Sequence, residues 1–265
     1  MRFASALPFC AVLLVLAARG GEAAPASSVF IEDLTWTELR DRIAAGTTTV
    51  IIPIGGTDQN GPHMAIGKHN VRVKVLAGRI AAALGNAVVA PVLSYVPEGN
   101  LNPPSAHMRW PGTITVPEDS FEKTIEYAAR SFKVHGFHDI VFLGDHGSTQ
   151  KGEEAVARKL DREWAATPVR AHAITQYYED SETGFGKMLE SRGYKPSEVG
   201  THAGLADTSL TLAVAPDLVR KDRLKPGGEG VAGDPSRASA ELGNLGVDAI
   251  VSRTVAAIKE AIARR

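Results

Sequence analysis

Short apolar segments alternate with longer amphipathic segments along most of this chain. Apolar runs of about four to eight residues bounded by glycine or proline are typical of buried strands, and apolar residues at helical spacing predict helices. The predicted strands cover residues 49–54, 87–93, 139–143 and 169–175. The predicted helices cover residues 35–45, 71–84, 117–135, 151–164, 210–215, 236–243 and 247–263. This alternation predicts a single α/β domain with a largely parallel β-sheet flanked by helices on both faces.

Polar side chains follow the first and third predicted strands. The residues concerned are Asp58, Asn60, His63 and His69 after the first strand, and Asp145, His146 and Ser148 after the third. Glycines precede both groups and allow tight turns that bring side chains together. Open α/β sheets bind ligands beyond the carboxyl ends of their strands. We therefore expect the functional site at this edge of the sheet.

Two further segments differ from the regular pattern. Residues 94–110 contain three prolines and predict a long loop, which carries Glu98, His107, Arg109 and two aromatic residues. Long loops in compact domains are commonly functional. Residues 177–197 are polar and contain glycines, which predicts a short helix followed by a mobile flap.

The chain has eight histidines. His135 and His138 flank a predicted helix end and are interpreted as surface or capping residues, and His172 as a hydrogen-bonded histidine of a strand. The others lie in glycine- or proline-rich loops, with Asp58, Asp145 and Asp207 nearby: His63, His69, His107, His146 and His202. Such a concentration of imidazole and carboxylate groups predicts a functional cluster.

The first residues resemble an export signal. Arg2 precedes an apolar stretch over residues 6–18, and small-residue cleavage patterns end at Ala23 and Ala26. The stretch is too short for a permanent membrane span. We predict a signal peptide over residues 1–26, a mature domain over residues 27–265, and a periplasmic or secreted protein without membrane association after cleavage.

The remaining composition limits the catalytic groups, metal ligands and partners that this chain can use. The only cysteine, Cys10, lies within the predicted signal, so a thiolate is not available for catalysis or metal binding. The net charge is −1 without a basic block, which argues against nucleic acid as a partner. The serine-hydrolase, P-loop and dinucleotide patterns are absent. Imidazole and carboxylate ligands then favour a divalent metal, zinc first and manganese as the alternative, that activates water.

Several ordered motifs resemble those of the creatininase (creatinine amidohydrolase) family over about residues 35–245. They are Gly55-Gly56-Thr57-Asp58-Gln59-Asn60-Gly61-Pro62-His63 with Gly67-Lys68-His69, His107 with Trp110-Pro111-Gly112-Thr113, Gly144-Asp145-His146-Gly147-Ser148-Thr149, His202-Ala203-Gly204 with Asp207-Thr208-Ser209, and Gly230-Val231 with Gly233-Asp234-Pro235. The resemblance implies a creatininase-like fold and a metal-dependent hydrolase of amide or cyclic amide/amidine C–N bonds. It also implies a small-molecule substrate and a homo-oligomer.

Departures from the family motifs affect the metal ligands. The positions that hold two metals in the family carry Asp58, Asn60, His69, His146 and Ser148 here. Asp58, His69 and His146 remain competent ligands of one metal. Asn60 and Ser148 are poor zinc ligands, and a neutral imidazole at position 69 does not bridge two metals as a carboxylate does. The resemblance therefore implies one metal, with the second lost.

The resemblance also suggests roles for the remaining residues. His202 is expected to transfer protons or stabilise an oxyanion, and Asp207 to orient it or act as a further ligand. His63 and His107 are expected to hold ligands by hydrogen bonds, although a purely structural turn explains His63 equally well. Asp145 is a further option for the lost acidic ligand. The alternative to an exported hydrolase is a non-catalytic protein that binds a metal or small ligand on the same scaffold.

Overall fold

A four-stranded parallel sheet forms the centre of the protein. The structure, a computed structural model, describes residues 28–264, so the predicted signal peptide lies outside the described residues. The strands are β1 (Thr49–Ile54), β2 (Ala87–Val89), β3 (Asp139–Gly144) and β4 (Arg170–Ala173), in the spatial order β2-β1-β3-β4. All neighbouring pairs are parallel. The predicted α/β class is confirmed.

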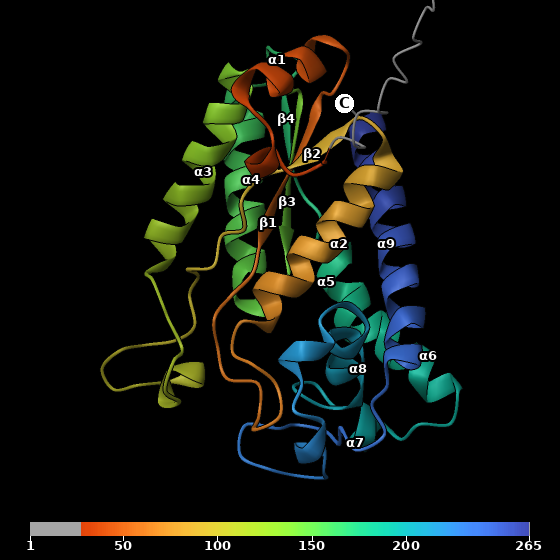
Figure 1. The fold of residues 1–265 in the computed structure, drawn as a ribbon. Coiled ribbons are helices and arrows are strands. Elements are labelled where there is room, and N and C mark those ends of the chain that lie inside the picture. The colour runs from red at the N-terminus through yellow and green to blue at the C-terminus, as the bar shows by residue number, and fades with distance from the viewer. Residues whose placement is uncertain (1–27, 265) are drawn as a thin grey trace, which may run out of the picture.

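Helices cover both faces of this sheet (Figure 1). One face is covered by α3 (Glu118–Val134) and α4 (Gln150–Glu163), and the other by α2 (Lys68–Leu84) and α9 (Ala240–Ala263). The remaining α-helices are α1 (Trp36–Ala44), α5 (Gln176–Glu179), α6 (Phe185–Ser191), α7 (Pro196–Val199) and α8 (Leu205–Val214). Short 3-10 helices cover Ile31–Asp33, Ala106–Arg109, Gly147–Thr149, Pro216–Leu218 and Lys221–Arg223. Within residues 28–264, no helix has both the length and the apolar character needed to cross a membrane.

The central strand β1 is buried on both faces because its side chains alternate between two cores. Val50, Ile52 and Ile54 pack with the apolar residues of α3 and α4. Ile51 packs on the opposite face with α2 and α9. A strand that is covered on both sides has no polar face, which is why this segment reads as a continuous apolar run.

The start of α1 follows the sequence signal closely. Glu38 N–H donates to Thr35 Oγ1 at 3.3 Å, and Thr35 N–H donates to Glu38 Oε2 at 2.7 Å. These reciprocal bonds form the capping box that the Thr-x-x-Glu spacing predicts.

Two helices begin earlier than the apolar periodicity indicates. Helix α2 begins at Lys68 rather than residue 71, and α8 begins at Leu205 rather than residue 210. Their first turns bury Lys68, His69 and Asp207. Because these inward-facing residues are polar, the spacing of apolar residues does not reveal the first turns of the two helices. Consequently, His69 lies on a helix and not in the loop that its glycine neighbours suggested.

The other differences also have local causes. Strand β2 ends at Val89, since Pro91 cannot donate a ladder hydrogen bond. Residues 177–197 are mostly helical, with a π-helical turn over Asp180–Gly184 joining α5 to α6, so the predicted flap is wrong. The last two predicted helices form the single helix α9.

Glycines within α9 allow its close packing against α8. A Cβ on Gly243 would lie 1.8 Å from the Ser209 carbonyl oxygen, so Gly243→Ala must push α8 and α9 apart. We expect a loss of about 2 kcal/mol or more in the free energy of unfolding. Urea titration followed by circular dichroism measures it, with the exposed neighbour Asn244→Ala as the control. Equal stability of the two variants would contradict this packing argument.

Candidate metal centre

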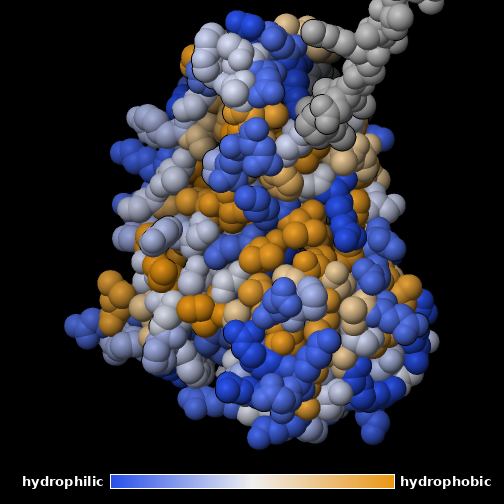
Figure 2. Space-filling view, in the orientation of Figure 1, coloured by the Kyte–Doolittle hydropathy of each residue, from blue (hydrophilic) through white to orange (hydrophobic). Residues whose placement is uncertain are grey.

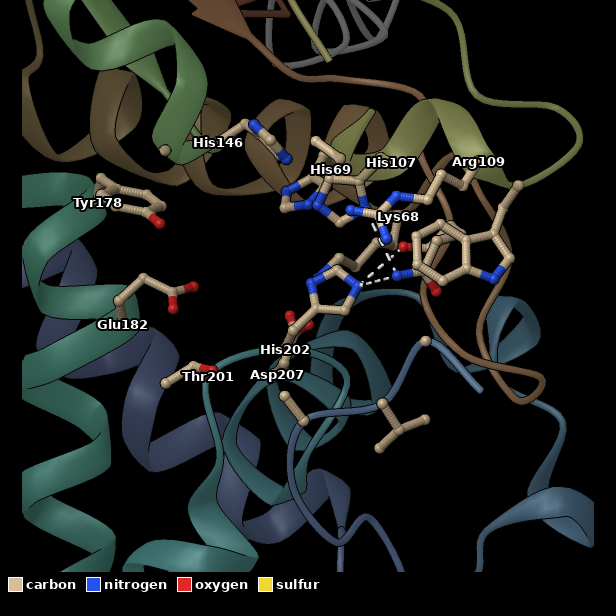
Figure 3. A pocket seen from close by; sticks show the side chains of 17 residues that line it. Lys68, His69, His107, Arg109, His146, Tyr178, Glu182, Thr201, His202 and Asp207 are labelled. Atoms are coloured by element: carbon tan, nitrogen blue, oxygen red, sulfur yellow. Dashed lines mark hydrogen bonds and ion pairs between the residues drawn. The ribbon is translucent and has the colours of Figure 1, made fainter. Parts of the chain in front are cut away.

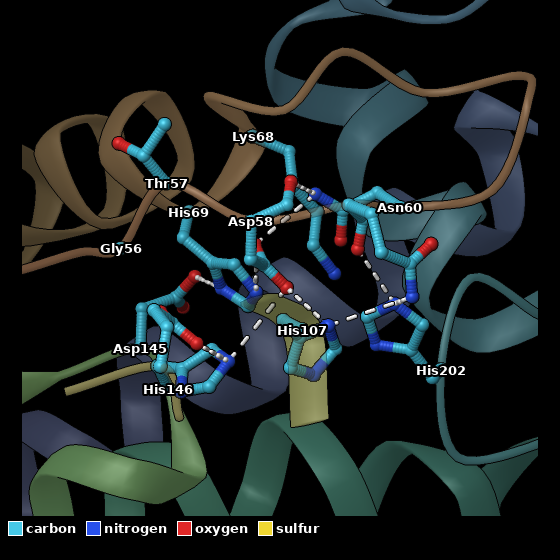
Figure 4. Close-up of polar contacts among 12 residues, drawn as sticks. Gly56, Thr57, Asp58, Asn60, Lys68, His69, His107, Asp145, His146 and His202 are labelled. Atoms are coloured by element: carbon cyan, nitrogen blue, oxygen red, sulfur yellow. Dashed lines mark hydrogen bonds and ion pairs between the residues drawn. The ribbon is translucent and has the colours of Figure 1, made fainter. Parts of the chain in front are cut away.

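Side chains from four separate segments converge beyond the carboxyl ends of β1 and β3. Asp58 follows β1, His146 follows β3, and Glu98 and His107 come from the proline-rich loop between them. One ligand atom from each of these four residues lies within 4.8 Å of the others. The sheet edge that the sequence indicated is therefore where the ligand-type groups meet (Figure 4).

The distances within this group are short. His107 Nδ1 lies 3.3 Å from Asp58 Oδ2, and His146 Nε2 lies 3.3 Å from Glu98 Oε2 and 3.7 Å from Asp58 Oδ2. The Glu98 carboxylate can approach the turn after β1 closely because position 56 is a glycine. A Cβ at this position would lie 2.8 Å from Glu98 Oε1. The glycine turn after β1 thus makes room for the carboxylate of a distant loop.

Among residues 28–264, several buried atoms of this group and of a neighbouring histidine have no hydrogen-bond partner. They are Asp58 Oδ2, both carboxylate oxygens of Glu98, and Nε2 of the adjacent His69. Leaving such atoms unpaired is costly. Carboxylate oxygens and imidazole nitrogens that face one another suit a divalent ion such as zinc or manganese. The residues present therefore fit a metal ion.

The predicted metal ligands overlap with this group without being identical to it. Asp58 and His146 belong to both sets. His69 lies at the edge of the group, with Nε2 3.7 Å from Asp58 Oδ1 and its ring centroid 4.9 Å from that of His146. His107, predicted as a supporting residue, lies inside the group. Glu98 had no assigned role, and only its position in a proline-rich loop pointed to it.

The residues around the group fix the orientation of its imidazoles. His69 Nδ1 lies 2.8 Å from Asp145 Oδ2, and a carboxylate accepts hydrogen bonds, so Nδ1 carries the proton and Nε2 keeps its lone pair. His146 Nδ1 lies 2.7 Å from Ser148 Oγ. In the structure, Asp145 and Ser148 therefore contact ligand-type histidines and do not belong to the group itself.

Asp207 is the counter-ion of two buried cations. It is ion-paired with the Lys68 ammonium, and its Oδ1 accepts from Arg72 Nη1 at 2.6 Å. The Ala203 amide also donates to it, at 2.9 Å. These contacts occupy the Asp207 carboxylate. His202 Nε2 instead lies 2.9 Å from the Gln59 carbonyl oxygen and 3.1 Å from Gln59 Nε2, so Gln59 holds this edge of the imidazole.

The last two predicted site residues have structural contacts. His63 Nε2 lies 3.0 Å from Thr208 Oγ1, which joins the Gly-Pro-His turn to α8. Asn60 Nδ2 donates to the Asp58 carbonyl oxygen at 3.0 Å. His63 therefore connects two segments of the chain, and Asn60 supports the turn that carries Asp58.

Burial and mutual charge shift the pKa values of the group. Burial raises the pKa of Glu98 to about 8, and the Asp58 charge adds to the increase. Burial alone would raise the pKa of Asp58, but His146, His69 and Lys68 outweigh it and hold that pKa well below its usual range. Burial would lower the pKa of His146, yet Asp58 and Glu98 raise it overall. The shifts therefore favour the protonated forms of Glu98 and His146 and the charged form of Asp58.

The group opens onto a cavity of about 490 Å³, a volume suited to a small molecule (Figure 3). Histidines 69, 107, 146 and 202 line it, together with Lys68, Arg109, Tyr178, Glu182 and Asp207. Sequence patterns did not indicate Tyr178 or Glu182, because they lie on α5 and the π-helical turn, within the segment predicted as a flap.

These features define an α/β protein with a candidate metal-binding cavity at the carboxyl edge of a parallel sheet. The family profile described as creatininase (creatinine amidohydrolase) matches residues 32–258. This chain belongs to the creatininase family, as its motifs indicated. Its fold is that of the family's hydrolases.

Named relatives cover most of the chain at low identity. Creatinine amidohydrolase of Pseudomonas putida is 27% identical over 202 residues, covering 74% of this chain and 76% of that protein. A mycofactocin precursor peptide peptidase of Mycolicibacterium smegmatis is 25% identical over 221 residues, covering 73% and 77%. A solved creatininase structure described with manganese superimposes with a TM-score of 0.75 at 25% identity, covering 89% of this chain and 99% of that one. A creatininase mutant described as Zn–Zn type gives a TM-score of 0.70 at 26% identity over the same shares.

A buried carboxyl behind the β3–α4 turn predicts a pH-dependent stability. Burial raises the pKa of Glu153 to about 7, although Thr149 and the Gly144 amide oppose this shift. The folded protein then holds a proton that the unfolded chain releases near pH 4.5, so this group's contribution to stability is lost as the pH rises towards 8. At pH 8 this loss amounts to about 3 kcal/mol of the free energy of unfolding, and Glu153→Gln should abolish it. At pH 5 the substitution should change the free energy of unfolding little.

Urea titrations of both proteins at the two pH values measure this difference, with the exposed Glu190→Gln as the control. A variant whose stability falls with pH as steeply as that of the native protein would contradict the assignment to Glu153.

Proposed function

We propose that this protein is an exported hydrolase that uses one divalent metal ion to cleave an amide or cyclic amide/amidine C–N bond of a small molecule. The observation that supports this proposal most directly is the convergence of ligand atoms from Asp58, Glu98, His107 and His146, in which the Asp58 and Glu98 carboxylates have oxygens without a hydrogen-bond partner among the described residues. The relatives that match are hydrolases by name: a creatinine amidohydrolase, a peptide peptidase and a 3-dehydro-scyllo-inosose hydrolase.

In this proposal, Asp58 and His146 hold the metal together with Glu98 and His107, and His69 contributes its free Nε2. Zinc is the first candidate and manganese the second, in line with the solved relatives. A single ion is favoured because Asn60 and Ser148 are uncharged and already bonded to Asp58 and His146, respectively. The ion supplies Lewis acidity, which polarises a carbonyl group and makes water more acidic.

The protein's own groups supply proton transfer and positioning. His202 lines the cavity and contacts Gln59 through Nε2, and its second ring nitrogen, Nδ1, takes and returns a proton in this proposal. Burial first, and the Lys68 ammonium second, lower the pKa of His202, which keeps it neutral and basic near pH 7. Asp145 and Ser148 hold His69 and His146 in orientation.

The cellular location and assembly are part of the same proposal. Residues 1–26 support export to the periplasm or medium. A homo-oligomer is supported by apolar residues that gather across the middle of one face (Figure 2). Ile66, Val71, Tyr95, Leu101 and Ile114 are exposed in the single chain.

A binding protein without turnover is the second candidate. It is favoured by Asn60, His69 and Ser148, which stand at positions where the resemblance implies other ligand types. Metal content and hydrolysis separate the two candidates, because a binder can hold a metal without cleaving an amide.

Metal content provides the first test. Protein purified without chelator should contain about one equivalent of zinc or manganese by mass spectrometry, and His146→Ala should lose it. His138→Ala, which changes an exposed histidine outside the cavity, is the control. Metal-free native protein, or about two equivalents per chain, would contradict the single-metal site.

Hydrolysis provides the second test. The metal-loaded protein should cleave at least one member of a panel of amides, lactams and cyclic amidines, and Glu98→Gln should lower kcat/KM by about 10- to 100-fold. The exposed Glu190→Gln serves as its control. A fully metal-loaded protein that cleaves none of the panel would favour the binding protein over the hydrolase.

A further inference from the structure

Two cations line the cavity without belonging to the candidate metal group. Lys68 lies on the first turn of α2 and is 1% exposed, and Arg109 lies at the end of the 3-10 turn that also carries His107. In Figure 3 both are on one side of the cavity, whereas Tyr178 and Glu182 are on the other. The side chains of the cavity are therefore unevenly distributed by charge.

The Lys68 ammonium retains hydrogen-bonding capacity. It has three N–H donors, and within residues 28–264 the Asp207 carboxylate is its only hydrogen-bond acceptor. Asp207 also neutralises Arg72 and accepts from the Ala203 amide, so its charge is shared. A buried ammonium that keeps free donors towards a cavity is expensive unless a ligand receives them.

Arg109 is the less restrained of the two cations. Its side chain is exposed and lines the cavity, and among the described residues it makes no hydrogen bond or ion pair. Its neighbour Trp110 is fixed by a hydrogen bond from Nε1 to Glu229 Oε1 at 3.2 Å. The Arg109 guanidinium is therefore attached to a fixed segment, and among the described residues none of its N–H groups has an acceptor.

The acidic groups of the cavity accept from only part of these donors: Lys68 is ion-paired with Asp207, and Arg109 has no acidic partner among the described residues. Asp58 and Glu98 belong to the candidate metal group, and Asp207 is already shared between Lys68 and Arg72. Glu182 lies across the cavity, and burial followed by the Asp207 charge raises its pKa to about 7. The side of the cavity that holds Lys68 and Arg109 consequently presents N–H donors of two cations.

We propose that the cavity selects substrates that carry a carboxylate group, and that Lys68 at the floor and Arg109 at the rim bind this group. The inference deepens the proposed function, since it names the substrate class of the same cavity. Lysine ammonium and arginine guanidinium both form charge-assisted hydrogen bonds with carboxylates, and arginine can bind one through two parallel bonds. The carboxylate would hold the substrate while its C–N bond faces the candidate metal group.

Binding of a matched pair of probes tests the proposal without requiring turnover. N-acetylglycine carries a carboxylate, and N-acetylglycinamide is its neutral counterpart. We expect the as-purified protein to bind the carboxylate at least about tenfold more tightly in calorimetry. Lys68→Met should bring the ratio of the two affinities close to one, Arg109→Gln should lower it about threefold or more, and Lys68→Arg should retain most of it.

The controls separate this site from the metal and from folding defects. Lys123→Met removes an exposed lysine of α3 and should leave the ratio unchanged. Metal content is measured for every variant, because a metal also attracts carboxylates and must stay constant. Arg109 is exposed, so Arg109→Gln keeps the test decisive if Lys68→Met fails to fold.

Equal affinity of the native protein for both probes would overturn the proposal. A carboxylate preference that persists in folded Lys68→Met, or one that Arg109→Gln leaves intact, would overturn it as well. Failure of the proposed function is distinguishable: a protein that prefers the carboxylate but cleaves no amide keeps this site and loses the hydrolase. A protein that cleaves an amide without the preference keeps the hydrolase and loses this site.

Discussion

The candidate metal centre depends on the hydrogen bonds that the Asp145 carboxylate accepts. Buried directly after β3, this carboxylate accepts hydrogen bonds from Arg72 Nε at 2.9 Å, His69 Nδ1 at 2.8 Å and Tyr177 Oη at 2.7 Å. It therefore ties the central sheet to α2 and α5. Removing one member of such a network leaves a buried charge uncompensated, which is typically strongly destabilising. The same bonds orient His69 towards the candidate metal group, so the stability of the fold and the geometry of the candidate site depend on the same carboxylate.

The polar interior is organised as two adjoining sets. In one set, the cations Lys68 and Arg72 are balanced by Asp207 and Asp145. In the other, ligand atoms of Asp58, Glu98, His107 and His146 lie close to one another, and carboxylate oxygens of Asp58 and Glu98 lack hydrogen-bond partners among residues 28–264. The first set balances its charges and supports the fold, while Lys68 keeps N–H donors towards the cavity, and the second set has the ligand types of a cation site. This contrast is what distinguishes a structural charge network from a candidate metal centre.

Apolar periodicity predicted the sheet well and the site helices less well. The bounds of β1 were predicted fully, and those of β3 to within one residue, because both strands are buried on two faces and bounded by clear breakers. The starts of α2 and α8 were missed, because their first turns bury Lys68, His69 and Asp207 rather than apolar residues. Gly243 and Gly246 suggested a break in α9 but instead allow its close contact with α8 and α6. A glycine that breaks a helix and one that permits packing look alike in a sequence.

The sequence by itself determined the fold class, the family and the edge of the sheet where the site lies, because strand patterns, turns and ordered motifs are local features. It also indicated Asp58, His69 and His146 as ligand-type residues. Only the tertiary structure decided that Glu98 and His107 meet Asp58 and His146, and that Lys68 and Arg109 line the same cavity. Residues 94–110 have no periodicity, so their position depends on contacts with distant segments, such as the fit of Glu98 against Gly56.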